Sequence, residues 1–286
     1  MSFLVDVLRL TRIEHSIMLV IAVIAAELIA GNGVLPNTYT LILSFVTPIF
    51  VSMSAFAIND YFDIEVDTLN KKIRPLTEGK MSPNHALAIA VISMIIGVAA
   101  SYLINWYCFA IALIFGALAL LYSYKLKETL FIGNAYVAFS MSIPFVFGNY
   151  VVSSNMGSAL ILVSVMIFIA GLGREIQGTI RDYKGDSARG VKSLPRCIGI
   201  YWSSMAALIA YIIAIAISTY LFFDVSPFLG NLIFGALILI TDILLLYAGF
   251  GYLSSRKQQF YDKARNISLA AMAIALVAIL ITAASL

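Results

Sequence analysis

Charged residues are scarce in this chain: they make up 12% of its 286 residues, whereas hydrophobic residues make up 62%. Together with a mean hydropathy of +0.97, this scarcity excludes an ordinary soluble domain. Cysteine is also rare, and Cys108 and Cys197 fall on opposite sides of the apolar pattern, too far apart to bridge, so we expect both to be reduced. The net charge of +3 follows from membrane topology, with room for an anion site, and gives no indication of nucleic-acid binding.

Apolar stretches long enough to cross a bilayer core, about 20 residues each, occupy most of the chain. They predict an all-α polytopic membrane protein with nine transmembrane helices in one membrane-embedded domain, residues 1–286. The positions of the two long polar loops favour two four-helix halves, about 10–127 and 128–253, followed by a ninth helix. The predicted spans are 15–33, 39–58, 85–104, 106–124, 131–152, 158–175, 201–223, 228–253 and 266–286.

Lysine and arginine are absent from every second loop. The loops around Asn32, Asn105, Ser153 and Asp224 carry none, so all 18 basic residues fall on the other side of the predicted membrane. Because basic residues remain on the cytoplasmic side, this pattern predicts a cytoplasmic N-terminus and an external C-terminus. We therefore expect an integral protein of the cell membrane whose long polar loops, and any site that they form, face the cytoplasm.

Carboxylates gather at the polar end of the second apolar stretch, in the segment NDYFDIEVD from Asn59 to Asp67. If the helix continues, Asp60, Asp63 and Asp67 share one face, because their spacing is i, i+3, i+7. A solvated helix end is the simpler explanation. However, negative charge at a helix C-terminus opposes the helix dipole and costs stability unless a cation binds. We therefore interpret this cluster as functional.

A second acidic cluster, RDYKGD from Arg181 to Asp186, follows the sixth apolar stretch. Asp182 and Asp186 are four residues apart and share a face if the segment is helical. Taken alone, they could be surface acids paired with neighbouring basic residues. Their position on the same side as the first cluster, at an equivalent helix end, favours a joint site.

Crowded carboxylates repel one another unless they share a cation. Mg²⁺ suits two facing carboxylate clusters because it retains water ligands and bridges to phosphate oxygens. The sequence therefore predicts a Mg²⁺ site at the membrane surface that holds a phosphate-bearing molecule. Arg74, Lys127 and Lys192 lie near the clusters and could clamp a diphosphate and stabilise it as a leaving group, although topology alone also explains their side.

A cation-coupled transporter that uses the same carboxylates as its ion site is the alternative from another functional class. Transporter ion sites usually lie near the bilayer midplane on interrupted helices. Here the two clusters lie at the membrane surface, and the middle of the apolar stretches is nearly free of acids. The sequence therefore favours an enzyme over a transporter.

With these motifs in view, the chain resembles the UbiA superfamily of intramembrane prenyltransferases over nearly its whole length. Residues 59–67 match the family pattern NDxxDxxxD, and Asp182 and Asp186 match its DxxxD motif. The run RPLTEG that begins at Arg74 is similar to the Arg-Pro-Leu-x-x-Gly run of the family. The segment YSYKLK from Tyr122 to Lys127 is similar to its Tyr-to-Lys loop.

The resemblance implies a magnesium-dependent transfer of an isoprenyl group inside a chamber formed by the helices. The expected Mg²⁺ ligands are Asn59, Asp63, Asp67, Asp182 and Asp186. Diphosphate binding is expected at Arg74, Lys127 and Lys192, catalytic roles at Asp60, Asp63, Tyr122 and Lys127, and acceptor binding at Arg12 and His15.

The implied partners are an isoprenyl diphosphate, from geranyl to geranylgeranyl or longer, a prenyl acceptor and membrane lipid. The acceptor stays open among an aromatic quinone precursor, geranylgeranylglyceryl phosphate, haem and a chlorophyll precursor. Two positions depart from common family patterns: Thr179 stands where many archaeal lipid-forming members carry an acid, and His15 where many members have asparagine. The segment TIRD from Thr179 to Asp182 is closer to the quinone-type branch.

Overall fold

The computed structural model describes residues 3–69, 71–129, 131–183, 187, 192–255 and 257–286. Within these residues the regular structure is helical, and nine helices are long and apolar enough to cross a membrane, which confirms the prediction. The nine are α2 (Ile13–Ala30), α3 (Thr38–Phe62), α5 (Pro83–Ile104), α6 (Trp106–Tyr124), α7 (Ile132–Val152), α8 (Ser158–Arg181), α10 (Leu194–Asp224), α11 (Leu232–Ser254) and α12 (Gln258–Ala284). Shorter elements are α1 (Phe3–Thr11), α4 (Ile64–Leu69) and the 3-10 helix η1 (Leu126–Glu128).

Asparagine side chains set several helix boundaries. Asn105 alone separates α5 from α6: its backbone is extended, its Oδ1 accepts a hydrogen bond from the Cys108 amide at 2.9 Å, and its Nδ2 donates to the Tyr150 carbonyl at 2.7 Å. Asn37 and Asn231 begin α3 and α11 with the same type of cap. Such caps satisfy backbone N–H groups that have no partner within the helix. This explains why a one-residue connection suffices at Asn105.

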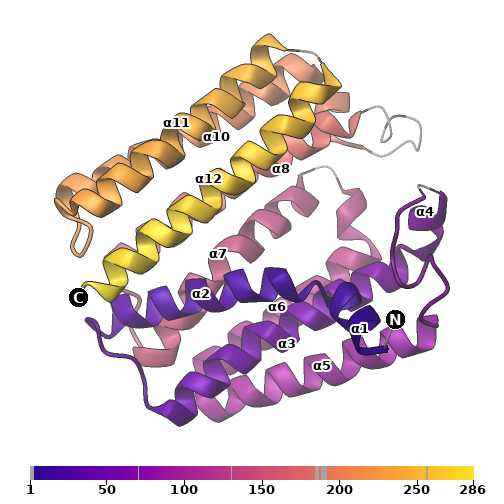
Figure 1. Cartoon of the computed structure of the whole chain (residues 1–286), viewed down its shortest axis with the longest axis horizontal. Helices are drawn as coiled ribbons and strands as arrows, with labels where there is room; N and C mark the ends of the chain where they lie inside the picture. Colours follow the sequence, from indigo (N-terminus) through magenta and orange to yellow (C-terminus); the bar gives the residue numbers. More distant parts are fainter. Residues whose placement is uncertain (1–2, 70, 130, 184–186, 188–191, 256) are drawn as a thin grey trace.

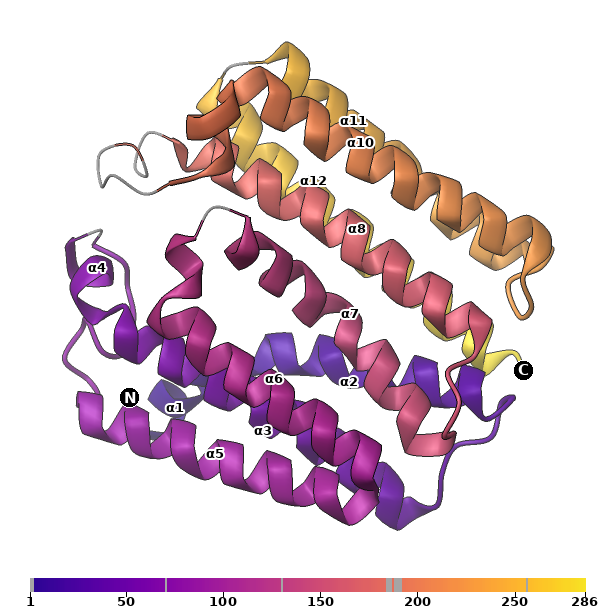
Figure 2. The ribbon, with the colours of Figure 1, turned by 180° about the vertical axis from the view of Figure 1, so that it is seen from behind.

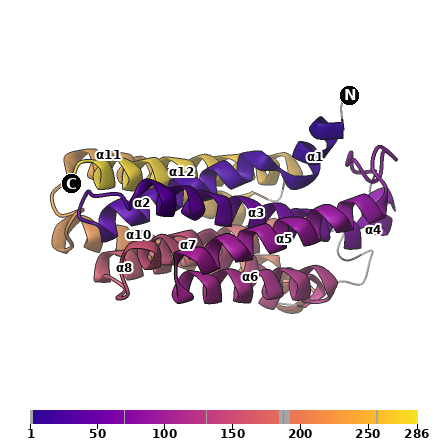
Figure 3. The same cartoon turned by 90° about the horizontal axis from the view of Figure 1, so that it is seen from below.

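The spanning helices form two groups in space. Figures 1 and 2 show α8, α10, α11 and α12 together on one side and α2, α3, α5 and α6 on the other. Helix α7 connects the groups because it packs against both α2 and α8, and α12 packs against α2. The N- and C-termini lie at opposite ends of the bundle, and α1 and α4 lie at the N-terminal end (Figures 1 and 3).

The outward surface of the bundle is apolar. Ile92 and Ile95 on α5 and Ile240 and Ile243 on α11 are among many large hydrophobic side chains that are exposed. An exposed apolar surface of this extent is unstable in water but suits contact with lipid acyl chains. The protein is therefore an integral membrane protein.

Small residues allow neighbouring helices to approach closely, and Gly148 of α7 provides a test. A Cβ atom at this position would lie 2.6 Å from the Val23 carbonyl oxygen and 2.8 Å from Ala26 Cβ, both on α2. We expect Gly148→Ala to lower the free energy of unfolding by about 1–3 kcal/mol through overpacking. Gly178→Ala is the control, because nothing lies within 4 Å of the added atom and alanine favours the helix. Unfolding in mild detergent measures both; equal stability of the two variants would contradict the predicted close packing.

Candidate active site

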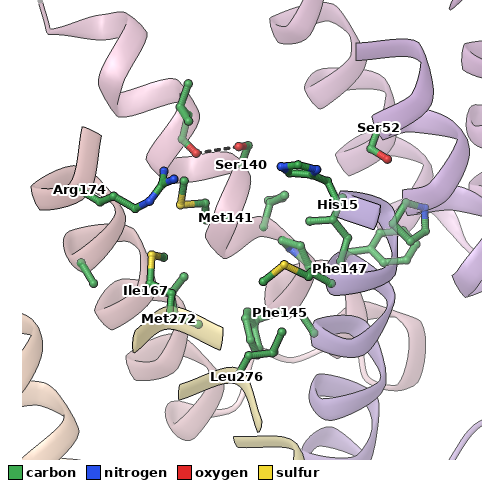
Figure 4. Close-up of a pocket in the computed structure, with 18 of the residues that line it drawn as sticks. His15, Ser52, Ser140, Met141, Phe145, Phe147, Ile167, Arg174, Met272 and Leu276 are labelled. Atoms are coloured by element: carbon green, nitrogen blue, oxygen red, sulfur yellow. Dashed lines mark hydrogen bonds between the residues drawn. The ribbon is translucent and has the colours of Figure 1, made fainter. Parts of the chain in front are cut away.

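A central cavity of about 570 Å³ lies inside the bundle. In the part of the chain that the structure describes, every spanning helix except α5 contributes to its wall. Figure 4 shows Arg174 of α8 and His15 of α2 on opposite sides of this cavity, while Phe145, Met272 and Leu276 lie farther along it. The cavity thus has charged groups towards one end and a mostly apolar remainder, which suits an amphiphilic substrate.

The first acidic motif lies where α3 gives way to α4. Helix α3 ends at Phe62, and the Asp63 amide donates to the Asn59 carbonyl at 3.0 Å as its last helical bond. Helix α4 then begins at Ile64. The continuous helical face expected for the three aspartates is therefore interrupted at Asp63, and the three carboxylates have different partners.

Asp60 is buried, with 2% of its surface exposed, and pairs with Arg12. Arg12 Nη2 donates to Asp60 Oδ1 at 2.6 Å, and its guanidinium lies 4.6 Å from the centre of the Phe56 ring. Burial lowers the pKa of Arg12, and the nearby Asp60 carboxylate opposes this shift. Arg12 also separates α1 from α2 in a left-handed conformation, with φ of 48°, which is uncommon for a non-glycine residue. The break turns the arginine towards Asp60, and its side chain lines the cavity.

Asp67 is also buried and lies close to two cations. Lys72 Nζ lies 2.8 Å from Asp67 Oδ1, and Arg74 Nε lies 3.8 Å from Oδ2. The same Arg74 nitrogen lies 4.0 Å from Asp60 Oδ2, so one arginine connects two of the motif's carboxylates. The loop holds its shape because the Arg74 amide donates to Thr77 Oγ1 at 3.0 Å and Leu76 is buried among the side chains of the surrounding helices. This explains the RPLT part of the sequence motif.

Asp63 contacts the residues that the sequence associated with it. Lys127, in η1, donates to Asp63 Oδ1, and Asn59 Nδ2 donates to Oδ2 at 3.2 Å. Asn59 lines the central cavity, so this group lies at the polar end of the chamber. Tyr122 also lines the cavity and stacks on Tyr136 with ring centres 4.8 Å apart.

The second acidic motif is described only in part. Asp182 is half-exposed and accepts two hydrogen bonds from Arg181, at 2.8 and 2.7 Å. Asp186 lies outside the described residues. Lys192 is exposed, and its side chain makes no hydrogen bond or ion pair within them. The contribution of these three residues to a joint site therefore stays a prediction.

The chemistry of the first motif fits Mg²⁺. Among the residues that the structure describes, no three acidic, histidine or cysteine side chains are close enough together to hold a metal ion. Asp67 Oδ1 is nevertheless a buried carboxylate oxygen that accepts no hydrogen bond, despite the nearby Lys72 ammonium. Asn59, Asp63 and Asp67 together offer the oxygen donors that Mg²⁺ prefers. Lys72, Arg74 and Lys127 balance the negative charge of Asp63 and Asp67.

A second cavity, of about 510 Å³, adjoins this region and has four arginines in its wall: Arg9, Arg12, Arg74 and Arg265. Arg12 and His15 line both cavities. Arg9 is held by Glu78, with Nη2 and Oε2 2.8 Å apart. A hydrogen bond from Lys80 lowers the pKa of Glu78, and Arg9 acts in the same direction. We refer to this space as the arginine pocket; it brings together basic residues from α1, the loop after α4, and α12.

Comparison with known proteins identifies the family. The model of the UbiA prenyltransferase family matches residues 19–270. The chain belongs to this family. It is similar to digeranylgeranylglyceryl phosphate synthase of Archaeoglobus fulgidus, with 36% identity over 94% of this chain and 92% of that protein. A solved structure from work on digeranylgeranylglyceryl phosphate synthase in membranes has a TM-score of 0.83 and 30% identity, with both chains fully covered.

The chain also shares its fold with solved UbiA homologues of lower sequence identity. A UbiA homologue from Archaeoglobus fulgidus, solved with bound GPP and Mg²⁺, has a TM-score of 0.64 and 20% identity over 96% of this chain and 99% of that chain. As a UbiA-family member, the protein is a prenyltransferase. The transporter alternative is set aside, because the acidic motifs that suggested it are those of the enzyme family.

Sequence reasoning missed Arg174 and Glu175 as residues of the UbiA chamber. Both line the central cavity, and Arg174 Nη1 donates to Glu175 Oε1 at 2.9 Å. The sequence did contain a signal for this pair, because adjacent opposite charges within an apolar span usually mark a buried site. The signal was missed because the predicted sixth span ended at residue 175, which placed both residues at the end of the helix. In the structure α8 continues to Arg181.

Proposed function

We propose that this prenyltransferase moves a geranylgeranyl group from geranylgeranyl diphosphate to the free hydroxyl of geranylgeranylglyceryl phosphate, in a reaction that requires Mg²⁺. The full-length similarity to digeranylgeranylglyceryl phosphate synthases supports this acceptor, since their name describes a glyceryl phosphate with two such groups. The homologue that binds GPP and Mg²⁺ supports the donor class and the metal. These similarities outweigh the quinone-type character inferred from Thr179, whose hydroxyl bonds to the Ile176 carbonyl of its own helix.

The arginine pocket is the structural observation that supports geranylgeranylglyceryl phosphate as the acceptor. A phosphomonoester carries up to two negative charges, and arginine matches phosphate geometry with its planar set of donors. Four arginines line this cavity, and Arg12 and His15 connect it to the apolar chamber. An acceptor phosphate can thus lie in the pocket while its glycerol reaches towards the chamber.

The diphosphate of the donor belongs at the first acidic motif. Asn59, Asp63 and Asp67, with Asp182 and Asp186, would hold Mg²⁺, which when bound supplies positive charge that stabilises the leaving diphosphate. Lys127, Arg74 and Lys192 would neutralise the remaining charge. Lys127 and Arg74, which are paired with aspartates in the structure, would exchange these carboxylate partners for phosphate oxygens.

The prenyl chain occupies the central cavity, whose wall is mostly apolar. The wall excludes water, which would otherwise capture an allylic cation. Tyr122, stacked on Tyr136, offers an aromatic surface to the developing positive charge. We further propose that this end of the bundle faces the cytoplasm, in keeping with the distribution of basic residues.

The arginine pocket predicts a specific kinetic change. We expect Arg265→Gln to raise the KM for geranylgeranylglyceryl phosphate about tenfold, because a charge-assisted hydrogen bond contributes about 1.5 kcal/mol. The KM for geranylgeranyl diphosphate should not change. Lys263→Gln, an exposed change on the same helix, is the control.

The assay follows transfer of radiolabelled geranylgeranyl in detergent, with geranylgeranylglyceryl phosphate, hydroxybenzoate and dihydroxynaphthoate as competing acceptors. Transfer to the glyceryl phosphate that is lost with EDTA is the expected result. Transfer only to an aromatic acceptor would refute the proposed acceptor, and an unchanged KM in Arg265→Gln would refute the role of the pocket.

A further inference from the structure

We propose that Glu175 is the group that takes the proton from the acceptor hydroxyl during ether formation. This inference rests on the proposed function, because only an acceptor that reacts through a hydroxyl oxygen must lose that proton as the new bond forms. It assigns a catalytic role to a residue outside both acidic motifs.

Glu175 lines the chamber in which the donor and the acceptor must meet. Its carboxylate lines the central cavity, with 21% of the side chain exposed. Tyr122, Arg12 and His15 line the same cavity, and Arg12 and His15 also line the arginine pocket. A glycerol hydroxyl whose phosphate lies in the pocket would therefore meet the donor beside this carboxylate.

One carboxylate oxygen of Glu175 is available for a substrate. Oε1 accepts from Arg174 Nη1 at 2.9 Å, whereas Oε2 makes no hydrogen bond with any described residue. Arg174 holds the group in position through this hydrogen bond. A carboxylate fixed by an arginine, with a free oxygen facing a cavity, has the arrangement required of a general base.

The other carboxylates are less suitable. Asp60, Asp63 and Asp67 are each paired with lysine or arginine side chains at the acidic motif. Asp242 also lines the cavity, but it lies near the middle of α11 and accepts a hydrogen bond from Ser218 at 3.2 Å. Glu175 is thus the carboxylate in the cavity wall that lies near the polar end of the chamber.

Ether formation breaks one C–O bond of the donor and one O–H bond of the acceptor. The bond between prenyl C1 and the bridging oxygen breaks, and its electron pair leaves with diphosphate. A lone pair of the acceptor oxygen forms the new C1–O bond, and the O–H electron pair stays on that oxygen as its proton moves to Glu175. The products are the ether, diphosphate and a protonated Glu175, which returns its proton to solvent after the products leave.

A purely structural role for Glu175, as the partner of the partly buried Arg174, is the alternative, and two measurements on Glu175→Gln separate it from catalysis. The first is transfer to geranylgeranylglyceryl phosphate. We expect kcat to fall about 100-fold or more, the usual contribution of a general base, with little change in either KM. The amide retains an oxygen that can accept from Arg174. Asp262→Asn, an exposed carboxylate-to-amide change on α12, is the control.

The second measurement follows ionisation without transfer. Geranylgeranyl diphosphate labelled with ¹⁸O at the bridging position is incubated with Mg²⁺ and an acceptor analogue that lacks the hydroxyl. Reversible cleavage then scrambles the label, and we expect equal scrambling in the wild type and Glu175→Gln. This combination, normal ionisation with slow transfer, is the signature of a lost proton acceptor.

Three results would overturn the proposal. Transfer by Glu175→Gln at the wild-type rate would exclude the carboxylate as base and leave His15, which lines both cavities, to be tested as Asn. Loss of both scrambling and transfer would indicate a structural role. Absence of wild-type transfer to geranylgeranylglyceryl phosphate would refute the proposed acceptor, and the role of Glu175 with it.

Discussion

Replacing Asp63 by alanine is expected to lower prenyl transfer at least about 1,000-fold, the upper range for removing one group that stabilises a transition state. Asp63 is the aspartate of the first motif that contacts both Asn59 and Lys127. Its loss removes an oxygen donor for Mg²⁺ and leaves Lys127 without its carboxylate. Because both side chains of the Asp63–Lys127 pair are partly exposed, the variant should remain folded.

The measurement compares transfer of labelled geranylgeranyl with unfolding of the same detergent-solubilised samples. Asp224→Ala serves as the control, because Asp224 also lies at the C-terminal end of a spanning helix, α10, but is exposed. EDTA should reduce wild-type activity to the level of Asp63→Ala. An Asp63→Ala enzyme that retains a tenth of wild-type activity would show that this carboxylate is not required.

Replacing Arg12 by alanine is expected to destabilise the fold by about 3–5 kcal/mol, because it leaves the buried Asp60 carboxylate without its main partner. Arg74 compensates only in part, since its Nε lies 4.0 Å from Asp60 Oδ2 and is shared with Asp67. The loss should also release α1, whose junction with α2 is held by the Arg12–Asp60 pair and the contact with Phe56. Chemical unfolding in mild detergent measures the change.

Two variants make this result specific. Arg9→Ala removes an arginine three residues earlier whose partner Glu78 is more exposed, so its cost should stay within about 1 kcal/mol. The double variant Arg12→Met with Asp60→Leu removes both charges and should recover most of the stability. If Arg12→Ala and Arg9→Ala were equally stable, the buried pair would not be important for the fold.

The sequence determined much of the fold in advance because each span is a local property. Apolar length and the distribution of basic residues predicted nine spans, and Asn105 marked its boundary through the capping chemistry of a single side chain. By contrast, the condition for one helical face across the first motif, a helix that continues through it, is not met, because α3 ends at Phe62. Local spacing cannot show where a helix will break.

The basic partners of these acidic residues were harder to predict from the sequence. Each acidic residue of the first motif could be identified from the local sequence. Its partner could not, because Lys127 and Arg12 come from distant parts of the sequence and reach the motif only when the helices pack together. The arginine pocket similarly combines Arg9 with Arg265 from the last helix. Such convergence depends on how the helices pack, which is a property of the assembled bundle.

The position of helix α5 indicates which residues to change in order to alter the prenyl chain length that this enzyme accepts. It is the span that contributes no described residue to the cavity wall, and it lies behind α3, where a Cβ atom on Gly97 would come within 2.8 Å of Val51 Cγ2. Val51 lines the cavity. Libraries that seek new prenyl chain lengths can therefore leave the lipid-facing positions of α5 unchanged. A single enlargement at residue 97 would reshape the chamber from outside by pressing its wall inward.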